Sequence, residues 1–496
     1  MKLNTNFNQF KKNYFSRKNQ IVFNKIKCKD LSIFENIINN LLIFPDSFIF
    51  ESVEGGKTRG RYTFVGIEPD KIWNFSKNSV FLKENSKNKK VSSKPYAYIK
   101  KLIKQFNFVL PAGLPPMSAV LAGYFSYDVI RYIEKIPDKC RDDLKIPDIR
   151  ILRPTYMVVH DNLKKEIFFI ANCFSDQKIP DLNFKFKEIK NRLNMIKNFS
   201  FFNVFSKKNK KTIKRNIKIK SNINKNKFKK IVNKAKDYIK KGDIFQVVLS
   251  QRFETTLSKE PIEIYKKLRK TNPSPFMFFF NFSDFQIIGS SPEILVRLRN
   301  NKITIRPIAG TRPRGSTKKL DEFFKKQLIN DKKELAEHLM LLDLGRNDVG
   351  KVSKINSVNV TEKFIVEKYS HVMHIVSNVV GKFDNKTEII DTMLAGFPAG
   401  TVSGAPKIRA MEIISELENE KRGVYAGGVG YFGASGDMDI CIALRTAIIK
   451  DGNIFIQAGA GIVYDSIPEK EYTETVNKAK ALFAAVDIAN TQFNTV

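Results

Sequence analysis

Runs of β-forming residues that follow one another across tight turns are the feature that most constrains the fold of this chain. In GYFGASGDMDICIALRTAII a Gly-Asp turn separates two such runs, and KDGN closes the next hairpin. Turns of this kind join neighbouring antiparallel strands. Earlier in the chain, further strand-like runs broken by Pro and Gly are SFIFESVE, RYTFVGI, AVLAGYFSYD, YMVVHD and EIFFIA. An α+β fold with much antiparallel sheet is therefore predicted.

Helical patterns alternate with strands, mostly in the second half of the chain. Helices are expected at residues 97–106, 228–241, 262–270, 331–344, 406–420 and 469–485. Strands of the second half are expected at residues 246–253, 276–282, 285–288, 294–298, 303–307, 428–433, 440–449 and 454–458. Between Glu188 and Asp237 there is no acidic residue, and Lys, Asn and Ile dominate. That stretch is predicted to be a linker or an exposed basic insert.

The net charge of +36, from 86 Lys and Arg against 50 Asp and Glu, at first suggests nucleic-acid binding. The excess is mostly Lys scattered among Asn, Ile and Phe, whereas Arg stays at motif positions. The Lys-rich stretch from residue 209 to residue 230 has little aromatic interleaving and no recognition motif. A basic RNA- or DNA-binding protein is kept as the alternative from a different class, and nucleic acid is not the expected partner.

The cysteines indicate a reducing compartment. Cys28, Cys140, Cys173 and Cys441 are far apart and form no CxxC or zinc-type spacing, which argues against a disulfide framework or a metal finger. The basic N-terminus lacks the apolar core of a secretory signal, and no apolar run approaches the length of a membrane span. A soluble, cytoplasmic protein without a membrane partner is expected.

Two pairs of glutamates are spaced to share a helix face. Glu334 and Glu337 lie in DKKELAEHLMLLDLGRND, and Glu471 and Glu474 lie in SIPEKEYTET. Either pair alone is more often ordinary solvated helix surface. Together they offer oxygen ligands of the kind that Mg²⁺ prefers, with some ligands acting through water.

Several segments also carry polar or charged residues at positions where an ordinary hydrophobic core would have apolar ones. Glu293 follows a Ser-Pro turn in GSSPEILVR, and RPIAGTRPRG contains Gly310 and Thr311. In SHVMHIVSNV, His371 and His374 are expected on a strand or at its edge, where one of them could be a core histidine with its hydrogen bonds satisfied. The Gly-rich turn of FPAGTVSGAPK runs into a helix whose free N–H groups could bind an anion.

Cations and backbone amides complete this set. Arg445 lies inside an apolar strand pattern, where it needs an anion, and the glycines of QAGAG let amides face a carboxylate. Arg445, Lys478 and these amides could hold carboxylates, the glutamates could hold Mg²⁺, and His374 with Glu293 could move protons. The residues by themselves indicate a Mg²⁺-dependent lyase or transferase for a carboxylated metabolite, without naming the substrate.

The ordered motifs resemble those of a known family. They are ESVEGGKTRGRYTFVG, GDIFQVVLSQRF, NPSPFMFFF, GSSPEILVR, RPIAGTRPRG, AEHLMLLDLGRNDVGKVS, HVMHIVSNV, PAGTVSGAPK, YAGGVGYF and QAGAGIVYDSIPEKEYTET. From about residue 21 onward the chain is similar to the chorismate-utilising enzymes, most closely to their anthranilate synthase component I branch. The resemblance implies a large antiparallel β-sandwich flanked by helices, with chorismate bound between the sheets.

The resemblance also divides the chain and assigns roles. It implies an N-terminal tail (1–20), an N-terminal component I region with a regulatory site (21–198), the basic linker or insert (199–227) and a chorismate-binding catalytic region (228–490). Glu337 and Glu474 would be direct Mg²⁺ ligands, with Glu334 and Glu471 acting through water. The implied chorismate-binding set is Gly310, Thr311, Thr401, Tyr425, Arg445, Gly459, Ala460, Gly461 and Lys478. Glu293 would protonate the departing hydroxyl, and His374 would assist elimination of pyruvate.

Two positions indicate which reaction is run. Relatives that form isochorismate or salicylate carry a Lys, which activates water, where this chain has Gln246, and aminodeoxychorismate synthases usually carry a nucleophilic Lys where it has Ala309. Both differences favour addition of ammonia and formation of anthranilate. An inactive relative kept as a scaffold is the third alternative, although every mapped catalytic position holds the expected residue type.

Partners and regulation follow from the same resemblance. No Gly-x-Cys-x-Gly nucleophile elbow surrounds any cysteine, so ammonia is expected from glutamine through a separate amidotransferase subunit, component II, in a heterodimer or a dimer of heterodimers (a heterotetramer). ESVEGG and NPSPFM resemble a tryptophan feedback site. Ser52 would bind the polar end of the amino acid, and Pro275, Phe276 and Met277 would line the indole pocket. A plain strand-end turn with an aromatic core segment is the alternative, and it predicts no effect of tryptophan.

Overall fold

The structure is a computed structural model that describes residues 2–52, 60–200, 219–257, 259–369, 372–486 and 493–494. Strands from the first part of the chain are β1 (Gln20–Lys27), β2 (Ser47–Glu51), β3 (Tyr62–Ser76), β4 (Ser79–Glu84), β5 (Lys87–Ser92), β6 (Val120–Phe125), β7 (Ile149–Asp161) and β8 (Glu166–Cys173). Its helices are α1 (Phe7–Phe15), α2 (Leu31–Leu41), α3 (Pro95–Gln105), η1 (Tyr127–Tyr132) and α4 (Leu182–Asn198). Most of the proposed insert, residues 201–218, lies outside the described residues.

The second part alternates helices with strands, as the sequence predicts. Its strands are β9 (Ile219–Ser221), β10 (Gln246–Thr256), β11 (Phe276–Asn281), β12 (Gln286–Ser291), β13 (Ile294–Arg299), β14 (Lys302–Ile305), β15 (Ile308–Pro313), β16 (Asn359–Lys368), β17 (Val372–Lys382), β18 (Gly404–Ala405), β19 (Gly428–Gly433), β20 (Met438–Ile442), β21 (Thr446–Lys450), β22 (Asn453–Ile462) and β23 (Phe493–Asn494). Its helices are α5 (Lys225–Lys240), α6 (Pro261–Thr271), α7 (Lys318–Asn330), α8 (Lys332–Gly350), α9 (Ile389–Ala395), η2 (Gly400–Val402), α10 (Lys407–Leu417), α11 (Pro468–Phe483) and η3 (Ala484–Val486).

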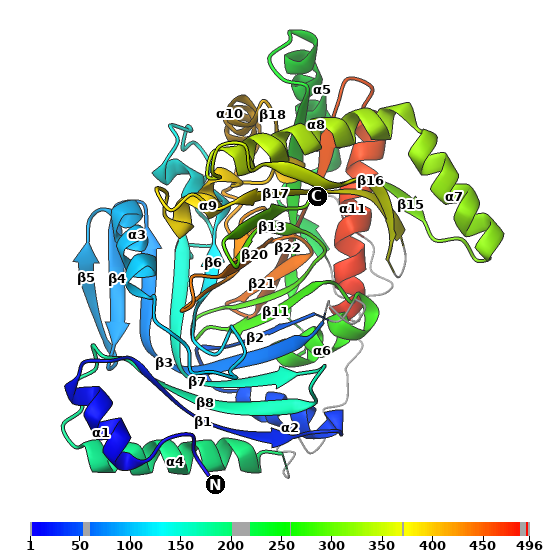
Figure 1. Cartoon of the computed structure of the whole chain (residues 1–496). Helices are drawn as coiled ribbons and strands as arrows, with labels where there is room; N and C mark the ends of the chain where they lie inside the picture. The colour runs from blue at the N-terminus through cyan, green and yellow to red at the C-terminus, as the bar shows by residue number, and fades with distance from the viewer. Residues whose placement is uncertain are drawn as a thin grey trace.

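Two long strands join the antiparallel layers. The second half of β7 pairs with β8 and its first half pairs with β6, while β3 runs beside it along its whole length with a bulge between Pro69 and Lys71. One layer therefore continues through β2, β11, β12, β21, β22 and β10, and the other through β6, β19, β20, β13, β14 and β17 (Figure 1). The predicted α+β fold with a large antiparallel sheet is confirmed.

The pairing crosses between the two parts of the sequence. Strand β11 pairs with β2, and β19 pairs with β6. Aromatic side chains fill the space between the layers, where Tyr431 of β19 lies with its ring centroid 5.2 Å from that of Phe64 on β3 and 5.9 Å from that of Phe50 on β2. Burial of such large rings contributes much of the apolar stabilisation. The described residues of the two parts of the chain thus build a common core.

Tight turns behave as the sequence pattern indicates. The turn between β21 and β22 contains Asp451 and Gly452 with positive φ of 49° and 75°, and the turn between β13 and β14 contains Asn300 and Asn301 with φ of 49° and 59°. Two successive left-handed residues match the twist of antiparallel hairpins. The KDGN hairpin is therefore confirmed.

The strand expected at residues 440–449 is wrong as a single element. Strand β20 ends at Ile442 and β21 begins at Thr446, and Arg445 between them has a left-handed backbone with φ of 47°. β20 pairs with β13 and β19, whereas β21 pairs with β12 and β22, so the chain passes from one layer to the other here. Apolar runs on both sides of the break hid it in the sequence.

The helix expected at residues 406–420 is shorter than predicted. α10 ends at Leu417 because Glu418 takes an extended backbone, and its carboxylate accepts hydrogen bonds from the backbone N–H and hydroxyl of Ser250 on β10. Among the helices that the structure describes, none combines the length and the apolar character needed to cross a membrane.

Candidate functional site

A cavity of about 860 Å³ brings most of the predicted site residues together. It lies between the ends of β10, β17 and β22, the turn from β12 to β13, η2 and α11. Residues from the predicted set that line it are Glu293, Thr311, His374, Thr401, Tyr425, Arg445, Gly459, Gly461, Glu474 and Lys478. Gly310, Ala460, Glu334, Glu337 and Glu471 lie outside this lining. His371 lies outside the described residues.

Glu293 is a buried carboxyl group at the wall of this cavity. It directly precedes β13, and its side chain is only 7% exposed. Burial raises the pKa of Glu293 to about 8, although the Thr401 hydroxyl, which donates to Glu293 Oε1 over 3.2 Å, opposes that rise. At neutral pH the group is therefore mostly protonated, as a general acid must be.

His374 has a defined ring orientation. Its Nδ1 lies 3.0 Å from the Gly310 carbonyl oxygen and 3.1 Å from Thr311 Oγ1. Because a carbonyl oxygen only accepts hydrogen bonds, Nδ1 carries the proton and Nε2 keeps its lone pair. Burial lowers the pKa of His374, so the neutral ring is favoured. Gly310 has a φ of 66°, which forms the bulge in β15 opposite β17.

Arg445 reaches the cavity from the junction between β20 and β21. Its guanidinium Nη1 lies 3.4 Å from Asn272 Oδ1, and Asn272 lines the same cavity. The segment that follows α6 therefore contributes to the site. Sequence reasoning missed Asn272, because an Asn before Pro is a common turn signal.

The glycines of β22 allow close approach of polar groups. A Cβ added at Gly459 would lie 2.6 Å from the Tyr425 hydroxyl, and one at Gly461 would lie 2.6 Å from Gln246 Nε2. Lys478 on α11 donates to the Gly459 carbonyl over 3.0 Å. The predicted QAGAG segment thus forms a cavity wall that side chains would close.

The acidic quartet is divided between α8 and α11, as the sequence predicts. Burial raises the pKa of Glu337, and the nearby carboxylates of Glu334 and Glu474 raise it further. Burial also raises the pKa of Glu471, with a contribution from Glu474. Lys478 lies 2.7 Å from Glu474, and Gln246 Nε2 donates to Glu337 over 3.3 Å.

No three His, Cys, Asp or Glu side chains in the described ranges converge closely enough to hold a metal ion. Instead, Glu334 pairs with Arg312 at 3.0 Å and Glu474 pairs with Lys478. The donor chemistry nevertheless suits Mg²⁺, because the carboxylates on the two helices raise the pKa values of their neighbours and a hard cation would relieve that repulsion.

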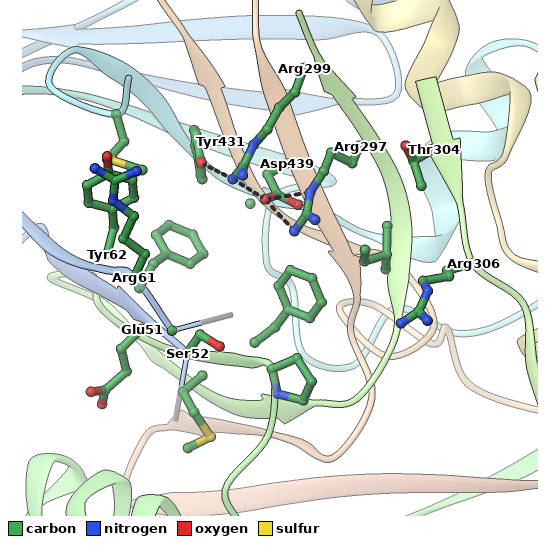
Figure 2. A pocket seen from close by; sticks show the side chains of 18 of the residues that line it. Glu51, Ser52, Arg61, Tyr62, Arg297, Arg299, Thr304, Arg306, Tyr431 and Asp439 are labelled. Carbon is green, nitrogen blue, oxygen red and sulfur yellow. Dashed lines mark hydrogen bonds and ion pairs between the residues drawn. The ribbon is translucent and has the colours of Figure 1, made fainter. Parts of the chain in front are cut away.

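A second cavity, of about 710 Å³, contains the residues predicted to bind tryptophan. Ser52, Pro275, Phe276 and Met277 all line it. Figure 2 shows the polar side of this cavity, where Asp439 accepts from Arg297 and Arg299. This charged cluster was not predictable from the sequence, because arginines that alternate along a strand are typical of a solvated face.

Comparison with known proteins agrees with this geometry. Residues 46–484 match the family of chorismate binding enzymes. Anthranilate synthase component 1 of Cereibacter sphaeroides is 47% identical over 491 residues, which cover 98% of each chain. The protein of the same name from Aquifex aeolicus is 46% identical and covers 89% of this chain and 90% of its own.

Solved structures give the same result. Anthranilate synthase component I from Streptococcus pneumoniae superposes with a TM-score of 0.75 at 37% identity, covering 86% of this chain and 93% of its own. The menaquinone-specific isochorismate synthase of Escherichia coli, at 17% identity and a TM-score of 0.68, covers 94% of each chain and shares the fold. The chain therefore belongs to the chorismate-binding enzymes. Within that family it groups with the anthranilate synthase component I proteins.

Proposed function

We propose that this protein converts chorismate and ammonia to anthranilate, pyruvate and water, with Mg²⁺ as cofactor, in the first step of tryptophan synthesis. The observation that carries the proposal is the buried Glu293, whose pKa burial raises to about 8 and which shares a cavity with His374, Arg445 and Lys478. Two cations suit a substrate with two carboxylates, and an acid beside a neutral imidazole suits a reaction that first protonates and then deprotonates.

Glu293 supplies the first proton. Ammonia attacks a ring carbon beside the ring carboxylate, the ring π electrons shift, and the C–O bond to the hydroxyl breaks. The ammonium group that forms releases one proton and becomes the amine. Protonation of that hydroxyl by Glu293 lets it leave as water. Thr401, which donates to Glu293 Oε1, then stabilises the carboxylate that results.

His374 takes part in the second step. Its Nε2 lone pair accepts the proton from the ring carbon that carries the new amine, and the released electron pair enters the ring. The bond to the enolpyruvyl oxygen breaks, enolpyruvate leaves and becomes pyruvate on protonation, and the ring becomes aromatic. The Gly310 carbonyl, which accepts from Nδ1, holds the tautomer that this step needs.

Glu337 and Glu474 would hold Mg²⁺ directly, with Glu334 and Glu471 acting through water. When bound, Mg²⁺ supplies a Lewis acid that neutralises a substrate carboxylate and withdraws electrons from the ring. In the present arrangement Lys478 occupies the Glu474 carboxylate. Lys478 contacts Oε1 of Glu474, so a cation at this carboxylate would share it with the ammonium group or replace that group.

The choice of ammonia rests on the residue at position 246, beside Gly461 of the cavity wall. Gln246 donates its amide to Glu337 and has no basic nitrogen with which to activate water. Purified protein given chorismate, ammonium and Mg²⁺ is expected to form fluorescent anthranilate. Accumulation of isochorismate, or of an aminated product that is not aromatic, would contradict the proposal.

The ammonia source is proposed to be glutamine, hydrolysed by a separate component II subunit in a heterodimer or a heterotetramer. Support comes from the family and from the cysteines, since Cys28, Cys173 and Cys441 are buried and burial raises the pKa of each thiol. A buried thiol is a poor nucleophile. Glutamine alone should support no synthesis until that subunit is added, whereas ammonium should suffice without it.

Tryptophan is proposed to inhibit the enzyme at the second cavity. Apolar walls from Pro275, Phe276 and Met277 suit an indole, and Ser52 with the Arg297, Arg299 and Asp439 cluster suits a zwitterion. Inhibition of the ammonium-dependent rate by tryptophan is the measurement that checks this proposal.

A further inference from the structure

A buried arginine behind the substrate cavity connects two of its walls. Arg422 follows α10 and is 2% exposed. Its Nε and Nη2 donate to the two carboxylate oxygens of Glu418 at 2.8 and 2.6 Å. Nη1 donates to the Val402 carbonyl at 2.7 Å, and Nη2 donates to the Val248 carbonyl at 2.6 Å. The planar fork thus holds two separate backbone segments and one carboxylate at once.

Both of those segments belong to the cavity wall. Val402 is the last residue of η2 and directly follows Thr401, whose hydroxyl donates to Glu293. Val248 lies on β10, and its own N–H donates to the Ser403 carbonyl over 2.9 Å. Val248, Thr401 and Val402 line the cavity, whereas Arg422 does not. Any influence of Arg422 on the reaction must therefore act through residues that it contacts, directly or in sequence.

The same guanidinium also supports an aromatic wall. It lies 5.7 Å from the ring centroid of Tyr425 and 4.8 Å from that of Tyr127. Glu418 in turn accepts from Ser250, and Ser250 Oγ accepts from Gln457, which lines the cavity. Contacts on several sides thus fix the orientation of the ion pair between Arg422 and Glu418.

We propose that Arg422 is a positioning residue for the reaction: it clamps η2 against β10 and thereby holds Thr401 in hydrogen-bond contact with the Glu293 carboxyl. This inference rests on the proposed function, because anthranilate formation is the reaction that the test measures. The contacts of Arg422 do not depend on it. The alternative is that Arg422 and Glu418 form an ordinary buried ion pair that supports folding and has no separate effect on turnover.

The chain offers a matched control for that alternative. Arg153 on β7 is 7% exposed and donates to both oxygens of Asp70 and of Asp176. Neither Arg153 nor its carboxylates line the substrate cavity. Arg153→Lys thus perturbs a buried arginine of similar chemistry without touching η2.

The experiment compares Arg422→Lys with Arg153→Lys. Lysine keeps the charge beside Glu418 but presents no planar fork to both carbonyls. Arg422→Lys should lower kcat with saturating ammonium on the order of 10- to 100-fold, with KM for chorismate changed by less than about threefold, since misplacement of a catalytic group by a fraction of an ångström affects turnover more than binding. Arg153→Lys should lower Tm and leave kcat unchanged. Equal effects of the two substitutions on kcat would overturn the proposal.

A double-mutant cycle that combines Arg422→Lys with Thr401→Val tests whether Arg422 affects kcat through Thr401. If Arg422 acts through Thr401, the combined variant should lose little more kcat than the worse single variant, whereas independent effects would multiply and would overturn the proposal. Should Arg422→Lys fail to fold, Glu418→Gln takes its place, because an amide presents only one oxygen to the guanidinium. A kcat for Glu418→Gln equal to that of the unmodified protein would also overturn it. Absence of anthranilate from the unmodified protein would instead contradict the proposed function.

Discussion

At the scale of single residues, the burial of Glu293 decides its chemistry. Burial outweighs the hydrogen bonds from Thr401 and from the Ile308 backbone, and the pKa of Glu293 is raised to about 8. A carboxyl with a raised pKa is protonated below that value and loses its proton above it. The acid form is therefore available at neutral pH, where an exposed glutamate would be ionised.

The pH dependence of kcat should reflect this group. With free ammonia held constant at each pH, kcat is expected to fall as pH rises through about 8. Glu293→Gln should lower kcat by about 10²- to 10⁴-fold, because the amide keeps the shape but donates no proton. Steady-state anthranilate fluorescence from pH 6 to 10 provides both measurements. A Glu293→Gln variant with the kcat of the unmodified protein would exclude this residue as the acid.

Glu474 and Glu471 lie on the same helix, but their substitutions should reduce activity to different extents. Glu474 lines the cavity, whereas Glu471 lies outside its lining. Glu474→Gln should abolish activity, and Glu471→Gln should reduce it by about 10- to 100-fold, as losses of outer-shell partners do. In a thermal scan, Mg²⁺ should raise the Tm of the unmodified protein and leave that of Glu474→Gln unchanged. A larger loss for Glu471→Gln would reverse the assignment of direct and water-mediated ligands.

At the scale of elements, a substitution that adds one methyl group to β22 tests how closely this strand approaches its neighbours. In Gly459→Ala the added Cβ would lie 2.6 Å from the Tyr425 hydroxyl and 3.0 Å from the Leu249 carbonyl oxygen. Movement of backbone or Tyr425 should destabilise the protein by about 1–3 kcal/mol and lower kcat/KM.

Gly350→Ala is the control for that substitution. Gly350 ends α8, and a Cβ there would meet nothing within 4 Å. Alanine favours helix over glycine, so Tm should stay level or rise and activity should be retained. Denaturant unfolding and chorismate kinetics of both variants check the pair. Equal stability and kcat/KM for Gly459→Ala and the unmodified protein would show that β22 has room for a side chain.

Elements with strong local patterns were predictable from sequence, and junctions between layers were not. Helices α8 and α11 carry the glutamate pairs as expected, and the KDGN hairpin forms because Asp451 and Gly452 tolerate left-handed φ. The break at Arg445 was missed because apolar residues continue on both sides of it. Arg422 carried no signal at all, since its partners are carbonyls of distant segments that only the tertiary fold brings together.

At the scale of the whole molecule, the two cavities share a wall. Pro292, Ile308 and Tyr369 line both. The segment after α6 also lines both cavities, with Asn272 at the cavity that contains Glu293 and Phe276 at the second one. A ligand in the second cavity can therefore alter the substrate site if it favours a different arrangement of these shared residues, and the coupling must then be reciprocal.

This arrangement leads to a prediction for tryptophan. Ser52 lines the second cavity only, so Ser52→Ala should weaken tryptophan inhibition while leaving uninhibited kcat within about twofold, because loss of a hydrogen bond to a charged ligand costs about 1.5–3 kcal/mol, or roughly 10- to 100-fold in affinity. Ser76→Ala, at the exposed turn between β3 and β4, is the matched control. Inhibition curves with ammonium as the nitrogen source check both variants. Calorimetry should detect tryptophan binding to inactive Glu474→Gln as well, since Glu474 lines only the other cavity. Undiminished inhibition of Ser52→Ala would remove Ser52 from the site, and loss of binding in Glu474→Gln would place tryptophan in the substrate cavity instead.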